Sequence, residues 1–139
     1  MDHANHLHIV QILKSALRKE PVEFAYLFGS LATGTATQQS DADIAVFISD
    51  TLSKEERFSL RLKLIGAISR ILKRRVDVVV LNDLTSLFFK YIIIQEGVMI
   101  YEKSGGRRAD FENRILSLYF DFRPFLEAYN RRYVQRNVQ

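Results

Sequence analysis

Residues 26–48 read YLFGSLATGTATQQSDADIAVFI and place a Gly-Ser pair at the end of one apolar run and two aspartates at the start of another. The first run, 22–28, is rich in aromatic and β-branched residues, which predicts a strand that ends at Gly29. The second run, 42–48, is apolar on both faces after Asp43, a pattern typical of a central strand that is covered on both sides. This stretch therefore predicts two neighbouring segments of a sheet, with charge at the entrance to the second.

The rest of the chain alternates between helical and strand patterns. A short helix from Ser30 and a polar loop over 33–40 are expected to join the two strands. Ser53 and Glu56 have the spacing of a capping box, which predicts a helix that runs to about residue 73. The other expected elements are a helix over 5–19 ended by Pro21, a strand over 75–81, a helix over 84–95 ended by Gly97, an edge strand over 98–102, a hinge at Gly105 and Gly106, and a helical segment from Arg107 that Pro124 kinks or splits. This order predicts a mixed α/β (α+β) fold with a small sheet of about four strands flanked by helices, and a C-terminal helical tail.

The bulk composition limits the class of protein. With 139 residues and 47% hydrophobic composition, we expect a single domain over 1–139, with a core over 22–102 and the helical tail over 107–139. Cysteine is absent, which excludes disulfides and thiolate metal sites. No apolar run approaches the roughly 20 residues of a membrane helix, and the N-terminus lacks a basic-then-apolar export signal. We therefore expect a soluble, cytoplasmic protein with no membrane partner.

The net charge of +4 is unevenly distributed along the chain. Residues 1–102 carry 12 basic and 12 acidic side chains, whereas residues 103–139 carry 8 and 4. A basic excess suggests an acidic partner such as a nucleotide or RNA, although an excess of this size is most often a solvated face. Direct binding of nucleic acid is therefore not expected.

Asp41 and Asp43 are two residues apart, so at the start of a strand their side chains point to the same face. Two carboxylates on one face can form a site for a divalent cation. A loop cap is an alternative explanation for Asp41, because Asp is common in turns. It does not explain Asp43, which precedes the apolar run and is costly to desolvate without a partner.

Asp77 is a third acid, inside the apolar strand expected over 75–81. If the two strands are neighbours, Asp77 joins Asp41 and Asp43 in a cluster whose charges repel unless a cation neutralises them. Hard oxygen ligands favour Mg²⁺, which commonly binds carboxylates together with substrate phosphates. An alternative of about equal weight is that Asp77 is paired with Arg74 or Arg75.

Gly29 and Ser30 supply features that suit a phosphate. Glycine lets the backbone turn sharply and approach a ligand closely, and serine offers a hydroxyl group. Taken alone, a Gly-Ser pair after a strand is weak evidence, because many strand-to-helix turns use it without binding anything.

The combined pattern is Gly29-Ser30, ten residues, then Asp41-x-Asp43, followed by an acid in a later strand. This pattern resembles the nucleotidyltransferase superfamily that includes DNA polymerase beta, and more closely its minimal nucleotidyltransferase (MNT) branch, over roughly residues 22–102. The resemblance implies that Gly29 and Ser30 hold the triphosphate of ATP. It also implies that Asp41, Asp43 and Asp77 bind Mg²⁺ and form the catalytic site, where Asp77 is a metal ligand or receives the hydroxyl proton.

One position departs from the family pattern. Relatives often have an arginine three residues after the serine of the pair, and this chain has Thr33 there. The phosphate charge must then be offset by another cation, for which Lys90 and the run Lys73, Arg74 and Arg75 are the candidates, although a surface role is the more common one for such a run.

A short MNT chain with a helical tail resembles the antitoxin of HEPN/MNT toxin-antitoxin pairs. The resemblance implies a HEPN-family ribonuclease toxin as partner, with AMP attached to a tyrosine hydroxyl of the toxin to neutralise it. Apolar residues of the tail recur at helical intervals, which is usually a core face and is also compatible with a contact surface: Phe111, Ile115, Leu118, Phe122, Phe125 and Tyr129. Two alternatives stay open: a non-catalytic antitoxin that acts by binding, and nucleotidyl transfer to a small-molecule hydroxyl.

Overall fold

The computed structural model describes residues 3–37 and 40–138, so residues 38 and 39 of the expected polar loop lie outside the described residues. Along the described part, the elements in chain order are α1 (His3–Arg18), β1 (Val22–Phe28), α2 (Ser30–Thr33), β2 (Ala42–Ile48), α3 (Lys54–Leu72), β3 (Val76–Val80), α4 (Leu87–Glu96), β4 (Val98–Glu102) and α5 (Gly105–Val138). Within this part, none of the helices is both long enough and apolar enough to cross a membrane.

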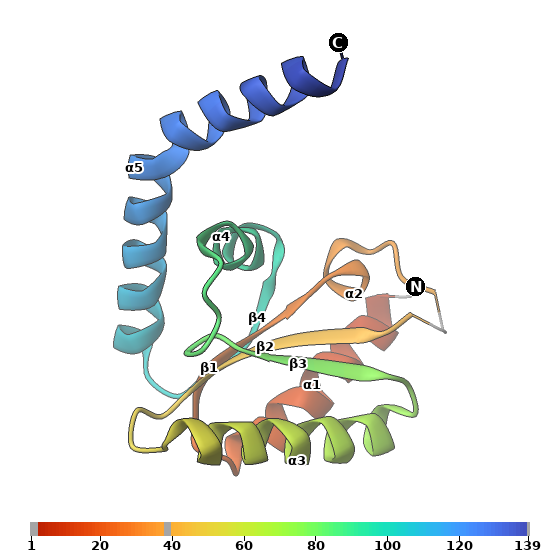
Figure 1. Cartoon of the computed structure of the whole chain (residues 1–139). Coiled ribbons are helices and arrows are strands. Elements are labelled where there is room, and N and C mark those ends of the chain that lie inside the picture. Colours follow the sequence, from red (N-terminus) through yellow and green to blue (C-terminus); the bar gives the residue numbers. More distant parts are fainter. Residues whose placement is uncertain (1–2, 38–39, 139) are drawn as a thin grey trace.

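The strands form one mixed sheet in the order β3-β2-β1-β4 (Figure 1). Strand β1 pairs antiparallel with β2 and β4, whereas β2 and β3 are parallel and are joined through α3. The expected fold class is therefore confirmed, with β2 as a central strand and β4 at an edge. Because β1 and β2 run in opposite directions, the end of β1 and the start of β2 meet at the same end of the sheet.

Helices cover both faces of the sheet (Figure 1). Helices α1 and α3 pack on one face over an aliphatic core that includes Leu13, Leu17 and Ile68. Helix α4 and the first part of α5 pack on the other face, where Phe24 and Tyr26 are buried with other aromatic side chains. The structure therefore adds α1, which precedes the core expected over 22–102, to the packed unit.

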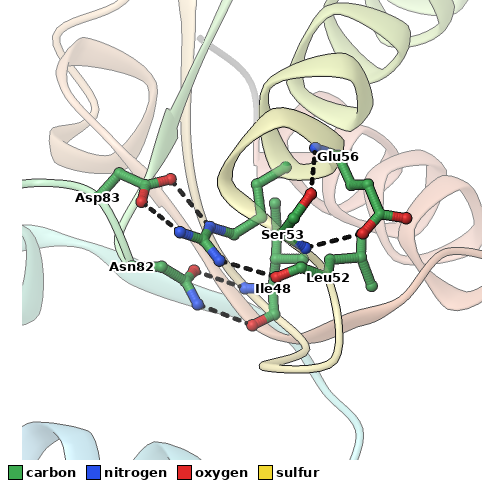
Figure 2. Close-up of polar contacts among 7 residues, drawn as sticks. Ile48, Leu52, Ser53, Glu56, Asn82 and Asp83 are labelled. Carbon is green, nitrogen blue, oxygen red and sulfur yellow. Dashed lines mark hydrogen bonds and ion pairs between the residues drawn. The ribbon is translucent and has the colours of Figure 1, made fainter.

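Polar contacts fix the relative position of β2 and β3 (Figure 2). The backbone N–H of Ile48 donates to Asn82 Oδ1 at 2.8 Å, and Asn82 Nδ2 donates back to the Ile48 carbonyl at 2.8 Å. The predicted capping box is present, since Ser53 accepts from the Glu56 N–H and the Glu56 side chain accepts from the Ser53 N–H. The pair of bonds between Ile48, the last residue of β2, and Asn82, just after β3, ties the two parallel strands together at this end of the sheet.

The C-terminal helix differs from expectation at its start. The hinge expected at Gly105 and Gly106 is wrong, because both glycines are the first residues of α5. The next two residues make ion pairs with other parts of the chain, Arg107 with Asp50 and Arg108 with Glu102, and these pairs tie the first turn of the helix to the domain. Pro124 lies inside the helix. The helix changes direction partway along its length without splitting (Figure 1), which is the kink expected of an interior proline.

Candidate functional site

The parallel pairing of β2 with β3 brings two of the predicted site residues together. Asp43 is the register partner of Asp77 on β3 and of Phe28 at the end of β1. Paired residues on adjacent strands point to the same face, so the carboxylates of Asp43 and Asp77 are neighbours. Asp41 lies one residue before β2 and two before Asp43, and it adds a third carboxylate at the same end of the sheet.

The carboxylates lie on the face that α4 and α5 cover only in part. The alternate residues of β2 and β3, including Ile44 and Val78, are fully buried under α1 and α3. Asp43 therefore points to the opposite face of the sheet, the face that carries the aromatic core residues under α4 and α5. Asp43 is half-buried there, while Asp41 and Asp77 are exposed. Solvent and a ligand can reach all three carboxylates.

The electrostatics of Asp43 reflect this crowding. Burial, and then the charges of Asp77 and Asp41, raise the pKa of the Asp43 carboxyl above its ordinary value. A bound cation would remove the repulsion, and carboxylate oxygens are the ligands that Mg²⁺ prefers. Among residues 3–37 and 40–138, however, no three acidic, His or Cys side chains converge closely enough to hold an ion by themselves. The donor set fits a cation that takes further ligands from phosphate oxygens.

Asp77 is engaged by an arginine that the sequence analysis missed. Arg61 Nη2 donates to Asp77 Oδ1 at 3.2 Å, and Arg61 Nε donates to the Val78 carbonyl at 2.6 Å. The alternative that paired Asp77 with Arg74 or Arg75 named the wrong arginine: β3 is an edge strand, and the side chain of Arg61 on α3 reaches its open edge. The helical pattern of α3 placed Arg61 on the surface and gave no signal for this contact.

Gly29 lies directly against the aspartate pair. Its φ of 74° is in the left-handed region, and a Cβ atom there would lie 2.4 Å from Asp43 Oδ2. No other residue fits both the backbone conformation and this contact. The Gly29 carbonyl accepts from the N–H groups of Ala32 and Thr33, which closes the turn into α2 behind Ser30. The first residue of the predicted Gly-Ser turn thus lies against Asp43, one of the three predicted carboxylates.

The candidate cations occupy different positions around this site. Thr33, at the position where relatives often have arginine, turns its hydroxyl toward the Gly29 carbonyl at 3.4 Å and toward Thr35 at 3.0 Å. Arg74 Nη1 donates to the Ser40 carbonyl at 3.2 Å, next to Asp41. Lys90 lies on α4, where burial and then the charge of Arg114 on α5 lower its pKa. Arg74 is therefore the candidate whose side chain reaches the loop that carries the carboxylates.

Comparison with known proteins gives matches across most of the chain. Residues 9–105 match the family model described as "Polymerase beta, Nucleotidyltransferase". The protein adenylyltransferase MntA of Shewanella oneidensis is 34% identical over 95 residues, which are 68% of this chain and 64% of that protein. The MntA protein of Aphanizomenon flos-aquae is 31% identical over 101 residues, 65% of this chain and 63% of that protein. The matches thus span slightly less than two thirds of these curated relatives.

Solved structures with a similar fold include two toxin-antitoxin structures. One is the tri-AMPylated Shewanella oneidensis HEPN toxin in complex with MNT antitoxin, with a TM-score of 0.67 and 21% identity over 96% of this chain and 99% of the matched chain. The other is a toxin-antitoxin with AMP-PNP, with a TM-score of 0.65 and 26% identity over 97% of this chain and 99% of the matched chain. The first, at 21% identity, supports the fold alone.

Proposed function

Because the chain belongs to the polymerase beta nucleotidyltransferase family, we propose that it transfers AMP from ATP to a tyrosine hydroxyl of a partner HEPN-family ribonuclease toxin and thereby neutralises that toxin. The observation that carries this proposal is the contact between the Gly29 turn and the Asp43 carboxylate, beside Asp77. The relatives named as protein adenylyltransferases support the reaction type. The toxin-antitoxin structure with AMP-PNP, at 26% identity, supports a toxin as the partner and an adenine nucleotide as the donor.

In the proposed reaction, the tyrosine oxygen of the acceptor attacks the α-phosphorus of ATP. An oxygen–phosphorus bond forms, the bond between the α- and β-phosphates breaks, and pyrophosphate leaves. Gly29 and Ser30 would hold the triphosphate, and Asp77 would be a metal ligand or the group that receives the hydroxyl proton. Asp41 and Asp43, with Asp77 as the third ligand, would hold Mg²⁺, which neutralises phosphate charge and orients the attack when bound.

The ion pair between Arg61 and Asp77 gives Asp77 two arrangements in this proposal. In the structure, Arg61 pairs with the Asp77 carboxylate at the edge of β3. When a nucleotide and cation occupy the site, Asp77 would turn toward Asp43 and take part in the reaction. The pair is solvent-exposed, with 58% of the Asp77 side chain accessible, and such a pair contributes less than about 1 kcal/mol. A bound dication can therefore displace it.

Arg74 is proposed to supply the charge that the family arginine supplies at the position of Thr33. Its guanidinium already contacts the loop carbonyl next to Asp41.

We also propose that residues 1–139 act as one nucleotidyltransferase unit. A chain that consumes ATP and has no cysteine would work in the reducing cytoplasm.

One observation favours a second function, neutralisation of the toxin by binding alone. Asp77 is engaged by Arg61, and Thr33 stands where relatives often have arginine, so the acids would then be remnants of an active site. Transfer to a small-molecule hydroxyl has no comparable support from this chain.

Intact mass spectrometry distinguishes the two functions. The purified chain is mixed with a purified HEPN-family ribonuclease toxin, ATP and Mg²⁺. The proposal expects AMP on the HEPN protein, lost with EDTA and lost in an Asp41→Ala, Asp43→Ala variant, with Glu55→Gln on the far face as a control that keeps the activity. A stable complex without any mass change would refute the enzyme and support binding alone.

A further inference from the structure

The apolar stripe of α5 is covered by the domain over only its first part. Phe111 packs against Phe24 and Phe47 of the sheet, and Ile115 is buried. The stripe then continues at the same helical spacing with side chains that are 36%, 51%, 72% and 67% exposed: Leu118, Phe122, Phe125 and Tyr129. We call these four residues the outer seam. Large apolar side chains in one exposed row are typical of an interaction surface.

The inner part of α5 is held firmly, so the outer seam projects from a fixed base. Tyr26 donates to Glu112 Oε1 at 2.5 Å, and Arg108 bridges Glu112 at 2.9 Å and Glu102 at 2.6 Å. Further along, a groove of about 350 Å³ lies between α4 and α5, with Phe88, Tyr119 and Tyr129 in its walls. A rigid base and an open groove together favour the binding of a preformed partner.

We propose that the outer seam is the docking surface for a helix of the acceptor protein, a helix with an apolar stripe bordered by acidic residues. The seam residues are spaced by four, three and four positions, which is the spacing with which one helix packs along another. The inference rests on the proposed function for the identity of this partner, the HEPN protein.

The charge at the outer end of the seam favours an acidic partner. Arg123, Arg131 and Arg132 lie on the exposed outer part of α5. Arg123 is paired with Glu127 within the same helix, at 3.0 Å. Parallel pairing of two copies along the seam would bring Arg131 and Arg132 of both copies together, which opposes that arrangement. An acidic helix would instead gain charge pairs at the rim of the apolar contact.

The outer seam lies on the same side of the sheet as the carboxylates, so a partner docked on the seam would lie on the side of the proposed nucleotide site. Beyond its bend, α5 runs across the α4 side of the sheet (Figure 1), and Asp43 and Asp77 point to that same side. An acceptor docked along α5 would be held on the side of the molecule where the nucleotide is proposed to bind. Docking there raises the effective concentration of the acceptor hydroxyl at the site.

The first test measures binding without ATP, by calorimetry with the HEPN protein that is used in the mass-spectrometry experiment. A Phe122→Ser, Phe125→Ser, Tyr129→Ser variant is expected to bind at least about 100-fold more weakly, because buried aromatic anchors dominate interface energies. The matched control, Phe58→Ser with Leu62→Ser, alters side chains on α3 that are 56% and 51% exposed and should change the affinity less than about twofold. Unchanged affinity in the seam variant, with far-ultraviolet circular dichroism as in wild type, overturns the proposal.

A second variant tests charge without touching the apolar row. Arg131→Glu with Arg132→Glu should slow association and reduce its salt dependence. Association that is as fast as in wild type, with the same salt dependence, would contradict the acidic partner. A wild-type dimer seen by light scattering and abolished in the seam variant would assign the seam to a second copy and overturn the docking proposal.

The outcomes separate docking from catalysis. An Asp41→Asn, Asp43→Asn variant should lose AMP transfer and keep the full affinity for the HEPN protein. Seam-dependent binding without AMP transfer by the wild type would leave the docking surface standing and refute the proposed reaction. The opposite result is a seam variant that transfers AMP at the wild-type rate when the acceptor is below saturation. That result would leave the proposed reaction standing and refute the docking surface.

Discussion

The two faces of the sheet are built differently. The face under α1 and α3 is aliphatic and closed along the length of β2, from Ala42 to Ile48. The face under α4 and α5 is aromatic and closed over only part of the same strand, and its uncovered end carries Asp43. The closed face can hold the strands rigid, so the open end of the other face can present charged groups that would be too costly to bury. The division predicts that stability and chemistry respond to substitutions on opposite faces.

Truncation of the closed face should have the largest effect on stability. Ile68 of α3 is fully buried, whereas Ile71 of the same helix is 51% exposed. We expect Ile68→Ala to lower the free energy of unfolding by about 2–4 kcal/mol, because it removes buried methyl groups and leaves a cavity. Urea denaturation measures this loss.

The matched control is Ile71→Ala, which should cost less than about 1 kcal/mol. AMP transfer by the Ile68 variant, measured well below its melting temperature, should stay near the wild-type rate. Equal losses of stability in the two variants would show that α3 does not divide into a buried and an exposed side as described.

Gly29→Ala should have the largest effect on the open face. The new Cβ atom would overlap Asp43 Oδ2, and the positive φ of Gly29 adds strain. We expect AMP transfer to fall at least about 100-fold, because the Gly-Ser turn and Asp43 are forced apart. Initial rates of AMP incorporation into the HEPN protein measure the effect.

Gly34 provides a closely matched control. Its φ of +80° is also positive, but no atom lies within 4 Å of the position that a Cβ would occupy. Gly34→Ala should therefore lower stability by about 1 kcal/mol through backbone strain alone and leave the transfer rate within a few-fold of wild type. If both variants lost the same activity, strain alone would explain the effect and the contact with Asp43 would have no special role.

Local patterns predicted most of this fold. The apolar runs predicted β1 and β2 with the bounds that the structure has, and the Ser53 capping box is present as predicted. These features are determined by residues that are close together in the sequence, so a local sequence pattern is enough to predict them. The proximity of Asp43 and Asp77 required one further assumption, that the two strands pair, and the parallel register supplies it.

The features that sequence reasoning missed depend on which distant part of the chain packs against a residue. Helical periodicity defined one stripe along α5, but it could not show that the domain covers Ile115 and leaves Phe125 exposed. Similarly, the contact of Arg61 with Asp77 exists because β3 is an edge strand. Strand order is a property of the whole fold and has no local signal. The roles of the predicted site residues stay predictions until transfer is measured.

A smaller effect is expected where α5 is anchored to the aromatic face. Tyr26 is buried, and its hydroxyl donates to Glu112. Tyr26→Phe should cost about 1–2 kcal/mol of stability, because Glu112 loses a partner in a partly buried place. The control is Tyr91→Phe, which keeps the ring that stacks on Tyr119 with 3.7 Å between the ring centroids. This variant should lose less stability than Tyr26→Phe.

Alkaline pH separates the role of the Tyr26 hydroxyl from that of its ring. Burial, and then the bond to Glu112, raise the pKa of Tyr26 above its ordinary value of 10.0. The unfolded chain therefore loses this proton at a lower pH than the folded chain, and wild-type stability falls as pH rises past about 10. The Phe variant should lack this part of the fall. Parallel pH profiles of the two proteins would contradict the buried hydrogen bond.

The smallest effect, and the one of opposite sign, is expected for Asp43→Asn. Because burial and the charges of Asp77 and Asp41 raise the pKa of Asp43, the folded state holds this proton more tightly than the unfolded state. Ionisation of Asp43 then destabilises the fold, a cost that is absent below the ordinary pKa of about 4 and complete above the raised pKa. The variant should gain less than about 1 kcal/mol of stability at neutral pH, since the half-exposed carboxyl is screened by solvent, and nothing near pH 3.

Urea denaturation at both pH values measures this gain in stability. Adding Mg²⁺ with a non-hydrolysable ATP analogue should make the wild type more stable than the variant, because only the wild type keeps the carboxylate that would bind the cation. A variant less stable than wild type at neutral pH without ligand would mean that the open end of the sheet gains stability from its charge, contrary to the contrast between the two faces.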